Sequence, residues 1–228
     1  MDFNFLSSIF FPPKCLSCEQ KLEMGTICES CRKTIAVYET VFCGVCDARM
    51  PDPKKICHPN APYVLGAAGN YENATLQTLI HALKFQMIRG AAEPLADILA
   101  SYIVSLDFDL HDFMVIPIPL SKRRERARGF NQSELIGKRC ALRLGIPCET
   151  EILMRIRHRK PQSETQNIAE RRENIRGCFA SRTLSLKKNK NVLLVDDVTT
   201  SGATFLEAAR TLKAAGAKKI IALAAAKA

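Results

Sequence analysis

One segment of thirteen residues, Val192–Thr204, constrains the fold of this chain more than any other. It begins with the apolar run Val192–Val195, continues with Asp196 and Asp197, and then passes through small hydroxyl-bearing residues and a glycine into a helical pattern. A continuous apolar run of this length is typical of a strand buried on both faces of a parallel sheet. We therefore expect two exposed carboxylates at the carboxyl end of a buried strand.

Helical and strand-like patterns alternate along the chain from residue 63 onward. Apolar residues at positions 76, 79, 80 and 83 have the spacing of an amphipathic helix that begins after Asn73. Further helices are predicted at about 91–104, 131–144 and 203–215, and strands at 113–119, 192–195 and 220–226. Strands that alternate with helices of this length predict an α/β fold, a parallel twisted sheet flanked by helices.

The turn that follows the two aspartates suits a phosphate group. Backbone N–H groups of such a turn, together with the amino end of the next helix, form an anion cradle, and Gly202 permits close approach. The carboxylates just upstream can accept hydrogen bonds from two sugar hydroxyls, so the segment predicts a ribose 5-phosphate site. The alternative is a plain helix cap at Thr200 or Ser201. Neither GxxxxGK[ST] nor GxGxxG occurs, which excludes P-loop and Rossmann sites.

Three Cys-x-x-Cys pairs lie within 32 residues near the amino terminus. Two such pairs complete the tetrahedral shell of a structural zinc ion. The candidate ligands are Cys15, Cys18, Cys28, Cys31, Cys43, Cys46 and Cys57. Two closed sites need eight ligands, so either one site is degenerate or His58 or Asp47 supplies the eighth. Because Cys57 and His58 are adjacent and would be strained partners on one ion, we expect one complete zinc site, with the pairing of the turns left open.

The positive charge of the chain is concentrated in one segment. The net charge is +10, and residues 121–190 contain 19 Lys and Arg against 7 Asp and Glu. Such a concentration suits phosphates, pyrophosphate or a nucleic-acid backbone, although a solvated basic face is the plainer alternative. The candidates for contact with nucleic acid, or for a flap over the site, are Arg155, Arg157, Arg159 and Lys160.

The composition is that of an ordinary globular protein, with 47% hydrophobic and 25% charged residues. No stretch approaches the roughly 20 apolar residues of a membrane span, and residues 1–11 lack the basic start and cleavage site of a signal peptide. Ten cysteines without an export signal favour a reducing compartment. We therefore expect a cytoplasmic protein without membrane insertion, in which the isolated Cys140, Cys148 and Cys178 are buried, inert thiols.

Val192–Thr204 resembles the signature for PRPP (phosphoribosyl pyrophosphate) in type I phosphoribosyltransferases. Taken with the cysteine pairs, Pro117–Lys122 and Arg128–Gln132, the chain resembles the ComF family (competence protein F, amidophosphoribosyltransferase-like) over nearly its whole length. The resemblance implies a zinc-ribbon-like module at residues 1–60 and a phosphoribosyltransferase-like domain at residues 61–228. Family members often carry a fourth Cys-x-x-Cys pair, whereas here Asn60 stands three residues after Cys57.

The resemblance also implies roles for particular residues. Asp196 and Asp197 would bind the ribose hydroxyls, and Ser121 and Lys122 would hold pyrophosphate, bridged through Mg²⁺. The 5-phosphate would lie against the loop that comprises Val198, Thr199, Thr200, Ser201, Gly202, Ala203 and Thr204. The basic segment at 155–174, in which Gln162, Arg171 and Asn174 match the family motif, would form a flap.

Two functions follow as hypotheses. The first is a PRPP-binding phosphoribosyltransferase, acting in natural competence and DNA uptake, that displaces pyrophosphate from the sugar; the acceptor is not readable. The second is a non-catalytic protein that binds single-stranded DNA or serves as a scaffold, with the PRPP pocket as a ligand sensor and the zinc module as a docking surface for the uptake machinery. In residues 121–190 the only aromatic side chains are Phe130 and Phe179, which weakens base stacking.

Overall fold

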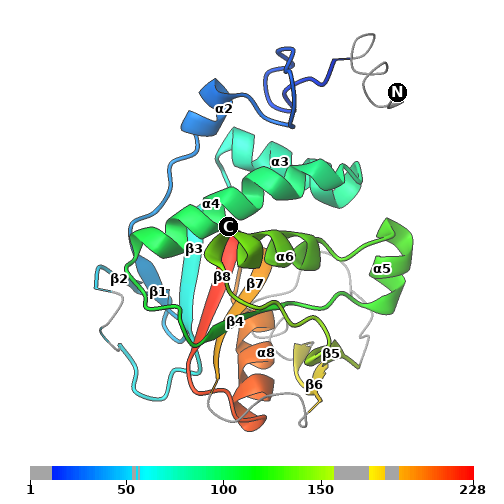
Figure 1. Ribbon diagram of the computed structural model, residues 1–228. Helices are drawn as coiled ribbons and strands as arrows, with labels where there is room; N and C mark the ends of the chain where they lie inside the picture. The colour runs from blue at the N-terminus through cyan, green and yellow to red at the C-terminus, as the bar shows by residue number, and fades with distance from the viewer. Residues whose placement is uncertain (1–11, 53–54, 56, 157–174, 183–189) are drawn as a thin grey trace.

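A computed structural model describes residues 12–52, 55, 57–156, 175–182 and 190–228 (Figure 1). Its centre is a six-stranded sheet in the order β2-β1-β3-β8-β7-β4. The strands are β1 (Val41–Cys43), β2 (Arg49–Met50), β3 (Val64–Asn70), β4 (Phe113–Pro117), β7 (Asn191–Thr199) and β8 (Ile220–Lys227). Strands β3, β8, β7 and β4 are parallel, while β1 and β2 extend the β3 edge in antiparallel fashion.

Helices cover both faces of this sheet, which confirms the predicted α/β architecture (Figure 1). One face carries α3 (Ala74–Phe85), η1 (Arg89–Ala91), α4 (Ala92–Ser105) and α6 (Gln132–Leu144). The other face carries α8 (Ala203–Ala214) and a two-stranded sheet of β5 (Leu153–Arg155) and β6 (Phe179–Ser181). Two short helices complete the described elements, α2 (Glu29–Lys33) near the amino terminus and α5 (Lys122–Arg128) after β4.

The helix boundaries follow from side-chain caps that the sequence contains. The side chain of Asn73 accepts a hydrogen bond from the backbone N–H of Leu76 at 3.0 Å. Asn73 is therefore the N-cap of α3, which begins at Ala74. Asn131 likewise caps α6, which ends at Gly145 in the left-handed conformation. These caps confirm the helices predicted after Asn73 and over residues 131–144.

Part of the first sixty residues belongs to the central sheet. Strands β1 and β2 belong to it, with Phe42 opposite Leu65 and Cys43 opposite Val64. Residues 12–40 instead lie beside α3 and α4, where Thr34 Oγ1 is 3.0 Å from Thr75 Oγ1. The boundary at residue 60 stays a prediction, and the candidate zinc ligand Cys43 belongs to strand β1 of the sheet. Among the described residues, no helix combines the length and apolar character needed to cross a membrane.

Candidate functional site

The aspartate pair lies within the sheet rather than beyond it. Strand β7 continues past the apolar run to Thr199, and Asp196 is paired in register with Ala224 of β8. The exposed fraction of Asp197 is 6%, and Asp196 is partly buried. The expectation of exposed carboxylates at a strand end is therefore wrong, because backbone pairing with β8 extends beyond the apolar residues.

Each aspartate has its own partners from the helical face. Lys84 Nζ, in the last turn of α3, lies 2.7 Å from Asp197 Oδ1. Ser133 Oγ donates to Asp196 Oδ1 at 2.6 Å, and the backbone N–H of Asp197 donates to the same oxygen at 2.9 Å. Burial and the adjacent charge of Asp197 nevertheless raise the pKa of Asp196 to about 7. Near neutral pH Asp196 is therefore partly protonated.

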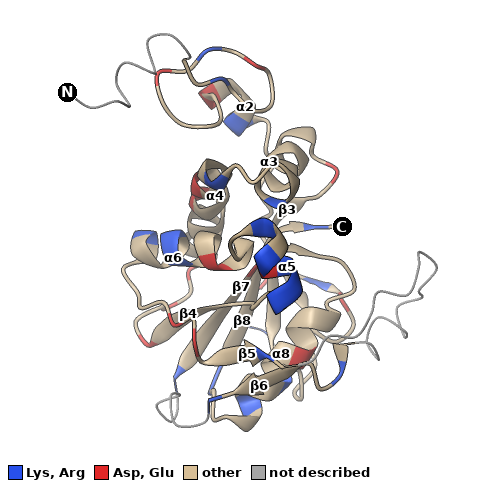
Figure 2. Ribbon diagram, turned by 90° about the vertical axis from the view of Figure 1, so that its right-hand side faces the viewer, with Lys and Arg blue, Asp and Glu red and all other residues tan. Residues whose placement is uncertain are grey.

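The two aspartates line a pocket of about 200 Å³ that is rich in cations. Four basic side chains line it with them, from α3, α5 and β5: Lys84, Arg124, Arg128 and Arg155. The Lys and Arg residues of α5 are coloured blue in Figure 2. Sugar hydroxyls suit the carboxylates of such a pocket, and phosphate oxygens suit its guanidinium groups.

Two buried donors in residues of this pocket have no partner among the described residues. They are Nε2 of Gln132, a residue only 1% exposed, and Nε of Arg155. A buried donor without an acceptor costs roughly 1–3 kcal/mol, so native structures rarely retain one without a reason. A ligand with phosphate or hydroxyl oxygens in the pocket would supply the missing acceptors.

The residues predicted for pyrophosphate are placed differently from one another. Ser121 is buried and caps α5, its hydroxyl accepting from the backbone N–H of Arg124 at 3.3 Å. Lys122 is exposed. Neither Ser121 nor Lys122 is among the residues that line the pocket, whereas Arg124 and Arg128 are. Helix α5 thus directs its residues at 124 and 128, which are one turn apart, toward the aspartates.

The loop after β7 leaves the start of α8 without a side-chain cap. Gly202 is the N-cap residue, with φ of +68°, and neither Thr200 nor Ser201 caps the helix. The plain-cap alternative is therefore wrong. Val198 and Thr204 line the pocket of the aspartates, while residues 200–202 line a second pocket of about 150 Å³ on the side of β1.

The remaining basic candidates are only partly described. Arg155 is half-buried at the end of β5, and its guanidinium lies 5.5 Å from the ring centroid of Phe179. Burial lowers the pKa of Arg155 and of Arg128 from their ordinary values. The other residues named for nucleic acid or for a flap lie outside the described residues: Arg157, Arg159, Lys160, Gln162, Arg171 and Asn174.

The candidate zinc ligands form two groups of four in sequence order, one of four cysteines and one of three cysteines and a histidine. The first is Cys15, Cys18, Cys28 and Cys31, and the second is Cys43, Cys46, Cys57 and His58; within each, the ligand atoms lie within 4.8 Å of one another. Sulfur atoms at 2.3 Å from a tetrahedral ion are about 3.8 Å apart. The Sγ atoms of Cys18 and Cys28 are 3.6 Å apart, and those of Cys46 and Cys57 are 3.7 Å apart, so both groups fit zinc.

The second group corrects the expectation of a single complete site. That expectation assumed that Cys57 and His58, which are adjacent in the sequence, could not both bind one zinc ion without strain. In the structure Cys57 faces Cys46, while Nδ1 of His58 lies 3.3 Å from Sγ of Cys43. Because the two adjacent side chains turn toward different members of the group, both fit the same tetrahedron, and Asp47 instead pairs with Lys227 at 2.8 Å.

Backbone donors in these turns stabilise thiolates. The N–H groups of Cys28 and Val45 each lie 3.4 Å from a cysteine Sγ, those of Cys15 and Cys43 respectively. Burial opposes ionisation, yet these bonds lower the pKa of Cys15 to about 6 and that of Cys43 to about 7. Of the isolated cysteines, Cys140 and Cys178 are buried as predicted and Cys148 is partly exposed.

Comparison with known proteins agrees with this geometry. The phosphoribosyl transferase domain model matches residues 131–228, and the double zinc ribbon domain model matches residues 6–59. Competence protein F of Haemophilus influenzae is 28% identical over 228 residues, which cover 92% of this chain and 95% of that protein. Competence protein ComFC of Bacillus subtilis is 28% identical over 87% of this chain and 77% of that protein.

A third relative is DNA utilization protein YhgH of Salmonella typhimurium, 27% identical over 87% of this chain and 96% of that protein. Each of these similarities covers at least 87% of the chain. The chain is therefore similar to competence protein F and ComFC over most of its length, with a double zinc ribbon module at its N-terminal end and a phosphoribosyl transferase domain at its C-terminal end.

Proposed function

We propose that this protein binds PRPP together with Mg²⁺ at the carboxyl edge of its parallel sheet and acts in DNA uptake. One observation carries the binding proposal: Asp196 and Asp197 share a pocket of about 200 Å³ with four basic side chains, beside the uncapped start of α8. The role in DNA uptake is carried over from relatives named for competence and for DNA utilization. Reduced cysteines in two zinc sites are consistent with the cytoplasm.

The parts of the pocket correspond to the parts of PRPP. The carboxylates of β7 would accept hydrogen bonds from the ribose hydroxyls, and the backbone of residues 199–204 would hold the 5-phosphate. Arg124, Arg128 and Arg155 would bind pyrophosphate, and Gln132 Nε2 would donate to one of its oxygens. Bound Mg²⁺ would neutralise part of the pyrophosphate charge.

In a transferase reaction these groups would act through position and charge. The bond from the anomeric carbon to pyrophosphate breaks as a bond to the acceptor forms, and the leaving oxygens gain negative charge. Fixed guanidinium groups at that position stabilise the charge without reorganisation during the step. Release of pyrophosphate from PRPP in the presence of Mg²⁺ and a panel of nucleophiles measures whether the protein carries out this reaction.

Charge reversal on α5 tests the location of the ligand. Arg124→Glu/Arg128→Glu alters two residues that line the pocket, and Arg123→Glu/Arg126→Glu alters two exposed residues of the same helix that do not. At about 1.5–3 kcal/mol per charged hydrogen bond, the first variant should lose on the order of 100-fold in PRPP affinity by calorimetry. The second variant should retain nearly all of it. Equal losses in the two variants would contradict the proposed location.

The alternative function, binding of single-stranded DNA without catalysis, is supported by a second observation. Lys122, Arg123 and Arg126 are exposed. They belong to α5, the ribbon of which is largely blue in Figure 2. Phe85 is 61% exposed, and the guanidinium of Arg128 lies 5.7 Å from its ring centroid. An exposed aromatic ring beside cations is a feature of single-strand binding surfaces. Here Arg123→Glu/Arg126→Glu and Phe85→Ala should weaken oligothymidine binding and leave PRPP binding unchanged.

A further inference from the structure

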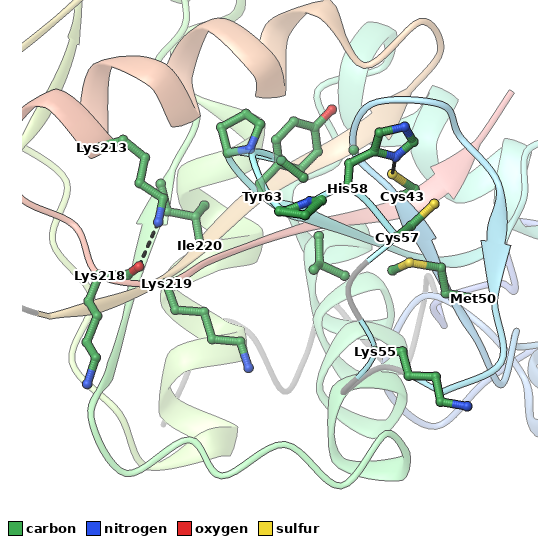
Figure 3. A pocket seen from close by; sticks show the side chains of 15 residues that line it. Cys43, Met50, Lys55, Cys57, His58, Tyr63, Lys213, Lys218, Lys219 and Ile220 are labelled. Carbon is green, nitrogen blue, oxygen red and sulfur yellow. Dashed lines mark hydrogen bonds between the residues drawn. The ribbon is translucent and has the colours of Figure 1, made fainter.

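Another pocket, larger than the proposed PRPP site, lies at the opposite end of the sheet. It has a volume of about 280 Å³ and lies between the second zinc group and the start of β8 (Figure 3). Val64 and Ile220, which begin β3 and β8, line it. The aspartate pair, by contrast, is near the carboxyl end of β7. A ligand in this pocket would therefore not overlap with PRPP.

The pocket combines an apolar lining with a basic rim. Its apolar side chains come mainly from β2, the segment before β3, and β8: Met50, Pro59, Ala61, Pro62, Val64 and Ile220. Lys213, Lys218 and Lys219 stand on one side and Lys55 on the other (Figure 3). Among the described residues that line it, none carries a carboxylate. The matching ligand is therefore anionic with an apolar part.

The lysines are not neutralised by the parts of the protein that the structure describes. No ion pair between any of the four and a described carboxylate is present. Lys213 Nζ donates to the backbone carbonyl of Lys218 at 2.6 Å, and Lys219 Nζ lies 4.8 Å from the ring centroid of Phe108. Burial lowers the pKa of both Lys213 and Lys219. An external carboxylate would relieve this unbalanced positive charge.

The geometry disfavours nucleic acid as the ligand. Base stacking needs an accessible aromatic face, and the aromatic side chain that lines this pocket, Tyr63, is only 4% exposed. Its ring packs against Phe205 with 6.3 Å between centroids, and its hydroxyl donates to the carbonyl of Gly202 at 3.4 Å. The volume is also near the lower end of small-molecule sites, which are about 300–1,000 Å³. It is better suited to one or two side chains of a longer ligand.

We propose that this pocket binds an acidic segment of a partner protein, one apolar side chain of which enters between Met50 and Ile220 while flanking carboxylates pair with the lysine rim. The site is independent of the proposed PRPP function. Cys57 and His58 also line the pocket. The segment that carries Pro59 and Pro62 begins at these two ligands, so metal binding there would fix this part of the lining.

Fluorescence anisotropy with three labelled probes tests the proposal. The first probe is a peptide of glutamates around a central Leu-Leu pair, the second has Ser-Ser in place of Leu-Leu, and the third is oligothymidine of matched charge. The first should bind the wild-type protein, and the second should bind about tenfold more weakly. Equal binding of the two peptides, or binding of oligothymidine alone, would overturn the proposal.

Two variants locate the binding. Lys55→Glu/Lys218→Glu reverses the rim, and Ala61→Trp fills the pocket without changing its charge. Each should weaken binding of the first probe about tenfold or more, while Lys21→Glu/Lys33→Glu, the same charge change on the first zinc ribbon, should have little effect. Zinc content and PRPP affinity should be unchanged in all three, which separates loss of docking from loss of folding. Equal weakening by the control variant would overturn the assignment to this pocket.

Discussion

Lys84 Nζ and Asp197 Oδ1 lie 2.7 Å apart, and this ion pair joins the last turn of α3 to the end of β7. The exposed fractions of the two side chains are 22% and 8%, so water screens the pair only weakly. Because Lys84 pairs with only one of the two aspartates, the two carboxyl groups have different electrostatic surroundings. Asp197 has a cation beside it, whereas Asp196 has a hydroxyl and a backbone N–H and a raised pKa.

Replacing Lys84 should destabilise the fold more than an ordinary surface substitution. Lys84→Met leaves two neighbouring carboxylates without their nearest cation, and we expect a loss of about 1–3 kcal/mol in the free energy of unfolding. The matched control is Lys33→Met, which removes an exposed pair with Glu29 and should cost less than about 0.5 kcal/mol. Urea denaturation measures both values. Equal losses would show that the Lys84 pair is no more important than a surface pair.

The titration of Asp196 should give stability an unusual pH dependence. Its pKa is raised from 3.8 to about 7 in the folded protein, so the folded state holds a proton that the unfolded state has lost. The contribution to stability is complete below pH 4 and is lost as the pH rises to about 7, at roughly 1.4 kcal/mol per unit.

Asp196→Asn removes this loss while keeping an oxygen that accepts from Ser133. The variant should match the wild-type protein near pH 4 and be more stable by a few kcal/mol at pH 8. Thermal denaturation across this range gives the difference. Parallel stability curves for the two proteins would contradict the raised pKa.

The loop at Gly202 should be sensitive to a single methyl group. Gly202 has φ of +68°, and an added Cβ would lie 2.9 Å from Oη of Tyr63. Gly145 has a similar φ of +66° with nothing within 4 Å of an added Cβ. Both alanine variants should lose about 1 kcal/mol of stability from backbone strain. Only Gly202→Ala should also weaken PRPP binding in calorimetry. An equal loss of PRPP affinity in Gly145→Ala would show that the loop at Gly202 has no particular role in binding the ligand.

Metal analysis should give two zinc ions per chain. Cys46→Ser/Cys57→Ser removes two ligands from the second group and should reduce the content to one, with the first group intact. Because β1 is part of the sheet, loss of the second ion should lower the unfolding temperature of the whole domain, unlike Cys18→Ser/Cys31→Ser. One zinc in the wild-type protein would mean that the second group is not a metal site.

The sequence predicted those parts of the fold that depend on local patterns. Asn73, Asn131 and Gly145 cap helices through bonds within a few residues, and the apolar run before Asp196 is a central strand. The sheet contacts of β1 could not be read locally, since they depend on pairing with β3 about twenty residues later. The number of complete zinc sites depended on the direction of the His58 side chain, and the spacing of the ligands in the sequence does not determine that direction.

Of the residues that line the candidate site, the sequence patterns indicated those of β7 and its loop, and Arg155. Lys84 and Ser133 lie far from Asp196 in sequence, and the packing of α3 and α6 on one face of the sheet brings them together. The burial of Asp197 was missed because an aspartate interrupts the hydrophobic pattern even where the strand continues. The sequence signal that could have indicated this ion pair is the position of Lys84, a basic residue in the last turn of an amphipathic helix.

Calorimetry of PRPP with Mg²⁺ on the wild-type protein and on Asp196→Asn/Asp197→Asn tests whether the aspartate pair binds the ribose of PRPP. The amides keep the shape of both side chains but weaken acceptance from the ribose hydroxyls, and circular dichroism with zinc analysis establishes that the variant is folded. PRPP should bind tightly to the wild-type protein, and the variant should lose affinity on the order of 100-fold. Unchanged affinity in a folded variant would contradict this prediction, because the ligand would then lie elsewhere.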